Sequence, residues 1–114
     1  MLKNKLIEII KYTNEKALQV HMHAIGEGDA NYGLDCYEAA YKQLPIINAH
    51  NALAHLTYVT NDMPQRFANN KVIAVVNPTW STWKYGSRED EIKIYGKKEL
   101  KICPRLSLLL MQAQ

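Results

Sequence analysis

Two histidines stand at positions 23 and 55, each at the end of an apolar stretch, and imidazole is a side chain that binds metal ions and moves protons. His23 lies in QVHMHAIGEGDA, residues 19–30, two residues after His21, and His55 lies in NALAHL, residues 51–56. Zinc and similar divalent ions bind imidazole nitrogen readily, so the pair is a candidate metal site. The alternative is a hydrogen-bonded histidine without a ligand, the commoner role of a single histidine on a strand.

The segments around these histidines alternate between helix and strand. Helical spacing of Leu2, Leu6, Ile9 and Ile10 predicts a helix over residues 2–13. A second helix is predicted by an apolar stripe that consists of Ala30, Leu34, Tyr37, Tyr41 and Leu44. Strands are predicted over residues 17–22, 51–56 and 71–76, the last rich in β-branched residues, as a strand buried on both faces should be. With short connections between them, this order implies parallel strands joined by helical crossovers.

Capping residues indicate where two helices begin. Asp29 is expected to cap the second helix. Asp62 with Gln65 three residues later resembles a capping box before a third helix, whose first turn would contain Pro64.

Side chains two residues apart on a strand share one face of the sheet. In the second strand, the face towards the helices would contain Ala54, and the opposite face would end at His55; the third strand would end in the same way at Asn77. Ligands of parallel α/β proteins collect at the C-terminal ends of the strands. We therefore expect His23 and His55 to lie within reach of one metal ion, with His21 as a buried neighbour rather than a ligand.

Two longer stretches, QVHMHAIGEGDANYGLDCYEAA and NALAHLTYVTNDMPQRFANNKVIAVVNPTW, resemble the central part of the amidohydrolase superfamily, specifically its YtcJ-like branch. Members of that branch read H-A-I-G-D at one strand end, A-x-x-H or I-E-H at the next, and a Q-P-x-W-like turn at the third. The resemblance covers residues 15–83, with His23, His55 and the turn Asn77 to Trp80 at the matching positions.

The resemblance implies a metal-dependent (β/α)8 TIM barrel, usually with a small flanking β-domain, that hydrolyses carbon–nitrogen bonds of small amides or cyclic amides. By resemblance, His23 and His55 are metal ligands at the ends of the fifth and sixth barrel strands, and the metal is a divalent ion, zinc in the first place. His21, Asn77 and Trp80 are candidates for contacts to the substrate or to the ligands.

The match departs from the family in several places. Asn77 stands where relatives usually carry Gln, and Glu27 stands where many carry Asp. The first-strand His-x-His ligands, the bridging lysine of the fourth strand and the acidic residue of the eighth strand have no counterpart. Asp62 and Glu27 are more simply explained as a helix cap and a loop residue, so no catalytic residue is assigned.

A complete barrel needs about 250 residues, whereas this chain has 114. The expected fold is therefore an α/β fragment of a barrel, with about three parallel strands and covering helices. Residues 1–83 resemble the region of strands five to seven, and residues 84–114 read as a charged loop and a C-terminal helix. The free edges of such a fragment imply self-association or pairing with a complementary barrel fragment, and little activity of the isolated chain.

The composition, 47% apolar and 22% charged, is that of an ordinary globular protein. No apolar run can span a membrane and no secretory signal is visible, which predicts a cytoplasmic protein without a membrane partner. Cys36 and Cys103 match no zinc or redox spacing and are expected to be free thiols. The net charge of +3 comes from residues 84–105, which indicates a solvated surface rather than a nucleic-acid interface.

Two other functions stay open. The chain is either a truncated or split-gene remnant that folds or associates without chemistry, or a binding module that uses the aromatic residues Trp80, Trp83 and Tyr85.

Overall fold

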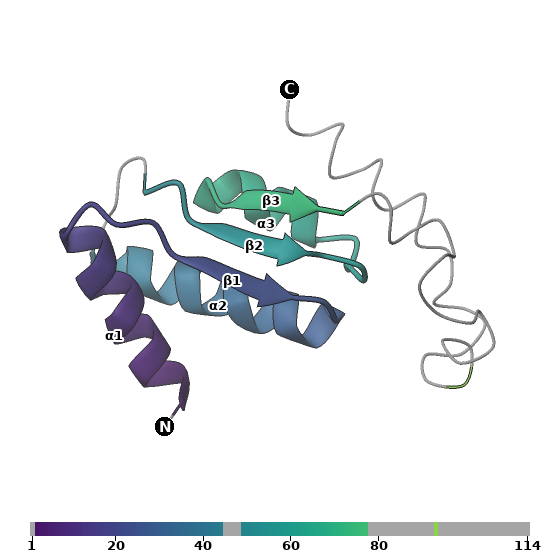
Figure 1. Cartoon of the computed structure of the whole chain (residues 1–114), viewed down its shortest axis with the longest axis horizontal. Coiled ribbons are helices and arrows are strands. Elements are labelled where there is room, and N and C mark those ends of the chain that lie inside the picture. The colour runs from purple at the N-terminus through teal and green to yellow at the C-terminus, as the bar shows by residue number, and fades with distance from the viewer. Residues whose placement is uncertain (1, 45–48, 78–92, 94–114) are drawn as a thin grey trace.

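The computed structural model describes residues 2–44, 49–77 and 93. Helices and strands alternate along the chain, in the predicted order (Figure 1). The elements are α1 (Leu2–Glu15), β1 (His21–Ala24), α2 (Glu27–Gln43), β2 (Ala52–His55), α3 (Met63–Asn70) and β3 (Ile73–Val76). The prediction of a small α/β unit with three parallel strands is confirmed. The predicted C-terminal helix and the aromatic residues after position 77 lie outside the described residues.

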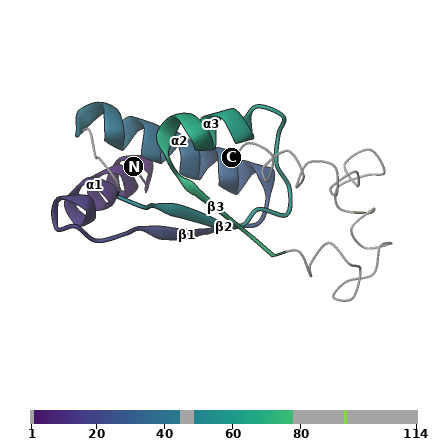
Figure 2. The ribbon, with the colours of Figure 1, turned by 90° about the horizontal axis from the view of Figure 1, so that it is seen from above.

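The sheet has the order β1-β2-β3, and both neighbouring pairs are parallel. All three helices lie on one side of it (Figure 2). Register places His23 beside Ala54 and Ala54 beside Val75, so these three side chains share a face. This is the uncovered face, because Leu53 points the other way and packs in the core with the helices.

The face assignment predicted for β2 is therefore wrong. Ala54 was expected to face the helices, but Leu53 takes that place, and Ala54 lies between the larger side chains of His23 and Val75. The alternation along β2 gave the wrong face because alanine is small and apolar, so it can lie on either face of the sheet. Leu53, the largest apolar side chain in this strand, decides the outcome, since burying it yields the most free energy.

Gly33 of α2 leaves room for the Leu53 side chain of β2. A Cβ atom at this position would lie 2.8 Å from Leu53 Cδ2, so the end of that side chain would have to shift.

The apolar stripe predicted for α2 is confirmed. Ala30, Leu34 and Tyr37 are fully buried, and Tyr41 is partly buried. The helix begins at Glu27, earlier than predicted, and the Asp29 carboxylate in its first turn accepts a hydrogen bond from the Gly26 N–H at 3.3 Å. Asp29 thus caps the helix from within.

The stripe predicted for α1 is only partly correct. Of the predicted residues, Ile10 is buried and Leu6 is partly buried, whereas Leu2 and Ile9 are exposed; Ile7, which was not predicted, is also buried. The buried face of α1 is therefore narrower than the spacing of its apolar residues predicted.

The capping box predicted for α3 does not form. Asp62 has a helical backbone conformation, and its carboxylate accepts a hydrogen bond from the Thr60 hydroxyl instead of a helix N–H. Gln65 donates to the side chain of Asn69, one turn later in the helix. Pro64 lies in the first turn, as predicted.

The strands are shorter than predicted, with four residues each. The first begins at His21 rather than at residue 17, because Ala17 has a left-handed backbone (φ 55°) in the turn after α1. Burial of β3 on both faces is also wrong for the part of the chain that the structure describes, since Ile73 is 42% exposed on the uncovered face.

Charged side chains tie the three helices together. Arg66 of α3 donates to Glu38, Asn31 and Asp35 of α2, at 2.7–2.8 Å. Asp35 also accepts a hydrogen bond from Lys3 of α1 at 2.9 Å. The bonds from Lys3 and Arg66 hold the pKa of the Asp35 carboxyl below its ordinary value.

Cys36 lies buried in α2 as a free thiol whose pKa is raised by burial, which agrees with the prediction, whereas Cys103 lies outside the described residues. Among the helices that the structure describes, none has the length and apolar character needed to cross a bilayer.

Candidate metal centre

The first residue of the site is His23 in β1. It is exposed and lies on the uncovered face of the sheet, one residue before the strand ends at Ala24. Both the position at the C-terminal end and the face agree with the sequence analysis.

The side chain of His55, the last residue of β2, lies beside that of His23, but strand alternation does not account for its position. Alternation after Leu53 and Ala54 would turn its side chain towards the helices. However, His55 and Leu56 both have left-handed backbones, with φ of 79° and 44°. This conformation is uncommon for residues other than glycine, and it breaks the alternation at the point where the strand ends.

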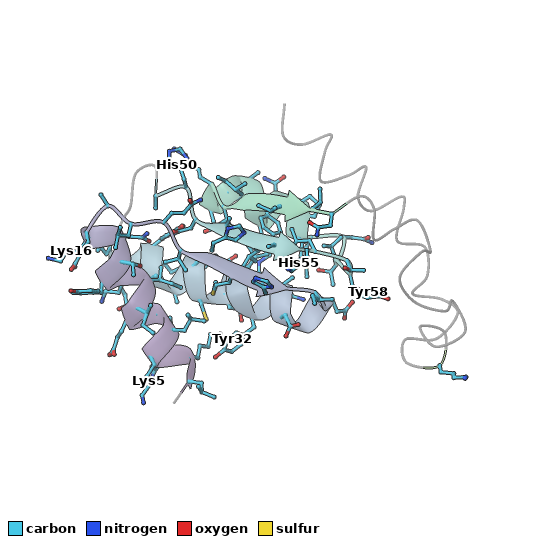
Figure 3. The ribbon with its side chains drawn as sticks, viewed as in Figure 1. Lys5, Lys16, Tyr32, His50, His55 and Tyr58 are labelled. Carbon is cyan, nitrogen blue, oxygen red and sulfur yellow. The ribbon has the colours of Figure 1, made fainter. Side chains whose placement is uncertain are left out.

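Two backbone hydrogen bonds hold this left-handed segment against the end of β1. The Leu56 N–H donates to the Ala24 carbonyl at 3.0 Å, and the Tyr58 N–H donates to the Ile25 carbonyl at 3.2 Å. The His55 side chain lies at the C-terminal end of β2 (Figure 3).

The two imidazole rings are in direct contact. His55 Nε2 lies 2.8 Å from His23 Nδ1, the ring centroids are 4.5 Å apart, and the ring planes are inclined by 56°. At this distance the nitrogens share one hydrogen bond, in which one nitrogen donates and the other accepts.

Asn77 adds a third side chain, directly after β3. Its amide nitrogen Nδ2 lies 3.4 Å from His55 Nδ1, a long hydrogen bond in which the amide donates. Three neighbouring strands therefore each bring one polar side chain to the same end of the sheet, as the sequence predicted for His23, His55 and Asn77.

The other predicted site residues are not part of this contact. His21 shares the uncovered face and pairs in register with Ala52, but it is exposed, so its predicted burial is wrong. Glu27 begins α2, and Asp62 is bonded to Thr60, which agrees with the simpler roles expected for them. Trp80 lies outside the described residues.

The distance between the two ring nitrogens can be compared with the distance in a zinc site. Zinc–nitrogen distances of about 2.0–2.1 Å and tetrahedral angles place two imidazole nitrogens roughly 3.3 Å apart, about half an ångström more than in this structure. Both rings would have to turn for their lone pairs to meet at one ion. Within residues 2–44 and 49–77, no three His, Cys, Asp or Glu side chains are grouped closely enough to hold a metal ion.

A buried hydroxyl lies close to the site in sequence. Thr57 Oγ1, two residues after His55, has no hydrogen-bond partner among the described residues. Folded proteins rarely leave such a group unpaired.

Sequence reasoning missed a polar cluster at the opposite end of the sheet. Asn51 is fully buried, and its side chain exchanges two hydrogen bonds with the Asn14 amide, at 2.8 and 3.1 Å. It also accepts from the Val20 N–H at 2.8 Å and donates to the Tyr41 hydroxyl at 2.8 Å. Asn51 was predicted as the first residue of a strand, and nothing in the local sequence indicates its distant partners.

Tyr37 belongs to the same end. Its hydroxyl lies 3.1 Å from the carbonyl oxygens of both Val20 and Ala52, and its ring stacks on that of Tyr41 with centroids 6.0 Å apart. Burial raises the pKa of both tyrosines.

Comparisons of the chain with protein-family profiles, with curated proteins and with solved structures find no match.

Proposed function

We propose that the chain is part of a metal-dependent hydrolase of the amidohydrolase type, in which His23 and His55 bind a divalent ion, zinc in the first place. The substrate would be a small molecule with an amide or cyclic amide bond. The observation that carries this proposal is the 2.8 Å contact between the two ring nitrogens at the C-terminal ends of neighbouring parallel strands.

The topology supports a barrel as the parent fold. In a (β/α)8 barrel, successive strands are neighbours, the helices lie outside, and the active site lies at the C-terminal ends of the strands. The order β1-β2-β3 with all helices on one side agrees with that plan (Figure 2). A doubly wound sheet would have helices on both faces.

A barrel requires more strands than the three described here. We propose that other segments or chains complete it, either a complementary barrel fragment or a second copy, by pairing with the outer edges of β1 and β3. Unpaired backbone groups along such edges bind added strands readily.

The described residues would supply binding and orientation. His23 and His55 would each hold the ion through a ring nitrogen, and Asn77 would orient the His55 ring through Nδ1. The bound ion would polarise the amide carbonyl and activate a water molecule. The remaining ligands and the proton acceptor would come from the completing segments, so hydrolysis by the isolated chain should be weak.

The second candidate is a unit that keeps the fold without chemistry. The observation that favours it is the hydrogen bond between His23 and His55, which satisfies one nitrogen of each ring without a ligand. Metal binding distinguishes the two candidates.

The test is a calorimetric titration of the chain with Zn²⁺. A second titration with Co²⁺ is followed by the visible absorption spectrum of the bound Co²⁺ ion. The double variant His23→Ala/His55→Ala should lose stoichiometric binding. The matched control is His21→Ala/His50→Ala, which removes the two remaining histidines; both are exposed, and His50 lies at the other end of the sheet (Figure 3). Equal binding by both double variants would reject the ligand assignment, and no binding by the unsubstituted chain would favour the second candidate.

A further inference from the structure

The outer edge of β1 presents backbone groups that no described strand pairs. The sheet joins β1 to β2 alone, and at the start of this pairing the Ala52 N–H donates to the Val20 carbonyl at 2.9 Å. Backbone groups of successive residues point to opposite edges of a strand. Because Val20 faces β2, the N–H and carbonyl groups of His21 and His23 point to the outer edge.

The outer edge of β3 is built in the same way. The Ile73 N–H donates to the Asn51 carbonyl at 2.8 Å, so the backbone groups of Ala74 and Val76 point away from β2. Lysine and proline on an edge strand are common devices that prevent the addition of a further strand. Neither β1 (HMHA) nor β3 (IAVV) contains such a residue, so both edges can accept one.

The helices cover the outer strands less completely than the central strand. Register sets Met22, Leu53 and Ala74 side by side on the covered face of the sheet. Leu53 in the middle is fully buried, whereas Met22, Ala74 and Val76 are only partly buried. The helix layer ends with α1 at the β1 side and with α3 at the β3 side (Figure 1). The covered face of β3 therefore has room for one more helix.

The helix at the β1 side exposes apolar side chains beside the core. Leu2, Leu6 and Ile9 follow one another at four and three residues, so they share one face of α1, here called the α1 stripe. Leu6 packs against the core, while Leu2 and Ile9 are 80% and 54% exposed. Tyr12 of the same helix and Leu18 in the segment before β1 are 63% and 57% exposed. With roughly 200 Å² for a fully exposed side chain of this size, these four exposed residues present about 500 Å², more than half of the ~800 Å² that each partner buries in a stable interface.

The two edges complement each other. A parallel continuation of the sheet from β3 of one copy to β1 of the next, at the level of the existing register, sets Ala74 opposite Met22 and Ile73 opposite His21. Met22 and Ala74 then stay on the covered face. The α1 stripe of the second copy lies over Ala74 and Val76 of the first, and apolar surface is buried on both copies.

We propose that a second copy of this chain binds head to tail, with the outer edge of β1 and the α1 stripe of one copy against the outer edge of β3 of the other. The inference rests on the proposed completion of the sheet by another chain, and it does not depend on metal binding. A two-fold pairing of β1 edges would leave the edge of β3 unpaired and Ala74 and Val76 half covered. The head-to-tail interface joins two different surfaces, so further copies can add until a ring closes.

The first measurement is the concentration dependence of the sedimentation coefficient of the full chain. Leu2→Gln/Ile9→Gln removes apolar contacts at exposed positions, so it should raise the concentration for half-association about tenfold or more. The matched control is Asn4→Gln/Glu8→Gln, at two exposed polar positions of the same helix, which should change that concentration by about twofold or less. Circular dichroism checks that both variants keep the fold.

The second measurement identifies the paired edges by a disulfide between copies. His21→Cys and Ile73→Cys are made in separate chains, both with Cys103→Ser, and both positions are exposed. Cys36 is buried and stays in place. Neighbouring strands lie about 4.8 Å apart, within the Cα separation that a disulfide spans. Oxidation of the mixture should link one chain of each kind, whereas either variant alone should stay unlinked on a non-reducing gel.

The outcomes for the two ideas are distinct. A monomer at all concentrations, or equal effects of the two α1 variants, overturns the inference even if the chain binds Zn²⁺. Linkage of His21→Cys to itself indicates two-fold pairing of β1 edges and also overturns it. Association with a mixed disulfide, in a chain that binds no Zn²⁺, supports the inference and rejects the proposed metal function.

Discussion

At the start of β2 the side chain of Asn51 is fully buried and makes four hydrogen bonds, whereas at the end of the same strand His55 is partly exposed and has a left-handed backbone. Only three residues lie between these two polar residues in the chain. The first is paired through every polar atom that it has, while the second contacts His23 at 2.8 Å and Asn77 at 3.4 Å.

The two ends of the strand differ in the pairing of their polar groups and in backbone conformation. At the N-terminal end, the arrangement of polar groups favours the folded state, because no buried donor or acceptor of Asn51 is left unpaired. At the C-terminal end, the positive φ of His55 places an imidazole beside that of His23, at some cost in backbone strain.

The largest effect should come from Asn51→Leu. This change leaves the Val20 N–H, the Asn14 amide and the Tyr41 hydroxyl without their partner, at a cost of about 3 kcal/mol or more in the free energy of unfolding. Urea denaturation followed by circular dichroism measures the loss. The matched control is Asn4→Leu at an exposed position of α1, which should change the stability by about 0.5 kcal/mol or less. Similar losses in the two variants would contradict the importance assigned to this end.

Alkaline pH should lower the free energy of unfolding through Tyr37 and Tyr41, which lie at the same N-terminal end of the strand. Burial raises the pKa of Tyr37 and Tyr41 in the folded state, so their contribution to stability is complete below the ordinary tyrosine pKa of about 10 and is lost as pH rises above it. The free energy of unfolding should therefore fall steadily above about pH 10. Urea denaturation at a series of pH values, combined with tyrosinate absorbance, tests this.

Two variants check the origin of the alkaline effect. Tyr41→Phe should reduce the slope of stability against pH, and Tyr12→Phe, at an exposed tyrosine, should leave it unchanged. An unchanged slope in Tyr41→Phe would show that the effect arises elsewhere.

The smallest expected effect is a change in the free energy of unfolding that has opposite signs when His55 and His23 are each replaced by glycine. His55→Gly relieves a left-handed backbone and should raise the free energy of unfolding by about 0.5–1 kcal/mol. His23→Gly removes a strand residue whose φ is not positive and should lower it by a similar amount, about 0.5–1 kcal/mol. Both variants lose the hydrogen bond between the rings, and His55→Gly also loses the 3.4 Å contact with Asn77. Equal changes on urea denaturation would mean that the backbone at His55 is not strained.

Much of the fold could be predicted from the sequence. The stripe of Ala30, Leu34 and Tyr37 identified the buried face of α2, and the β-branched residues of β3 identified a strand. The meeting of His23 with His55 was also predicted, because both stand at the ends of neighbouring parallel strands. It was predicted for an incorrect reason, since alternation along β2 would have turned His55 to the helices.

The remaining features depend on contacts that local sequence does not reveal. The left-handed conformation of His55 has no glycine or asparagine to indicate it. Asn51 finds Asn14 at a separation of 37 residues and Tyr41 at a separation of 10, so its role exists only once the chain has folded. The choice of Leu53 rather than Ala54 for the covered face depends on packing against the helices, which alternation along β2 does not reveal.

The Arg66 contacts have a consequence for the kinetics of the unit. Its three bonds to α2 span 28, 31 and 35 residues, so each closes a segment of chain that contains β2. Interactions that form after the rate-limiting step of folding act mainly on the rate of unfolding. We expect the Arg66 bonds to belong to this class, because they join residues far apart in the chain, so this guanidinium group should prolong the lifetime of the folded unit more than it speeds its assembly.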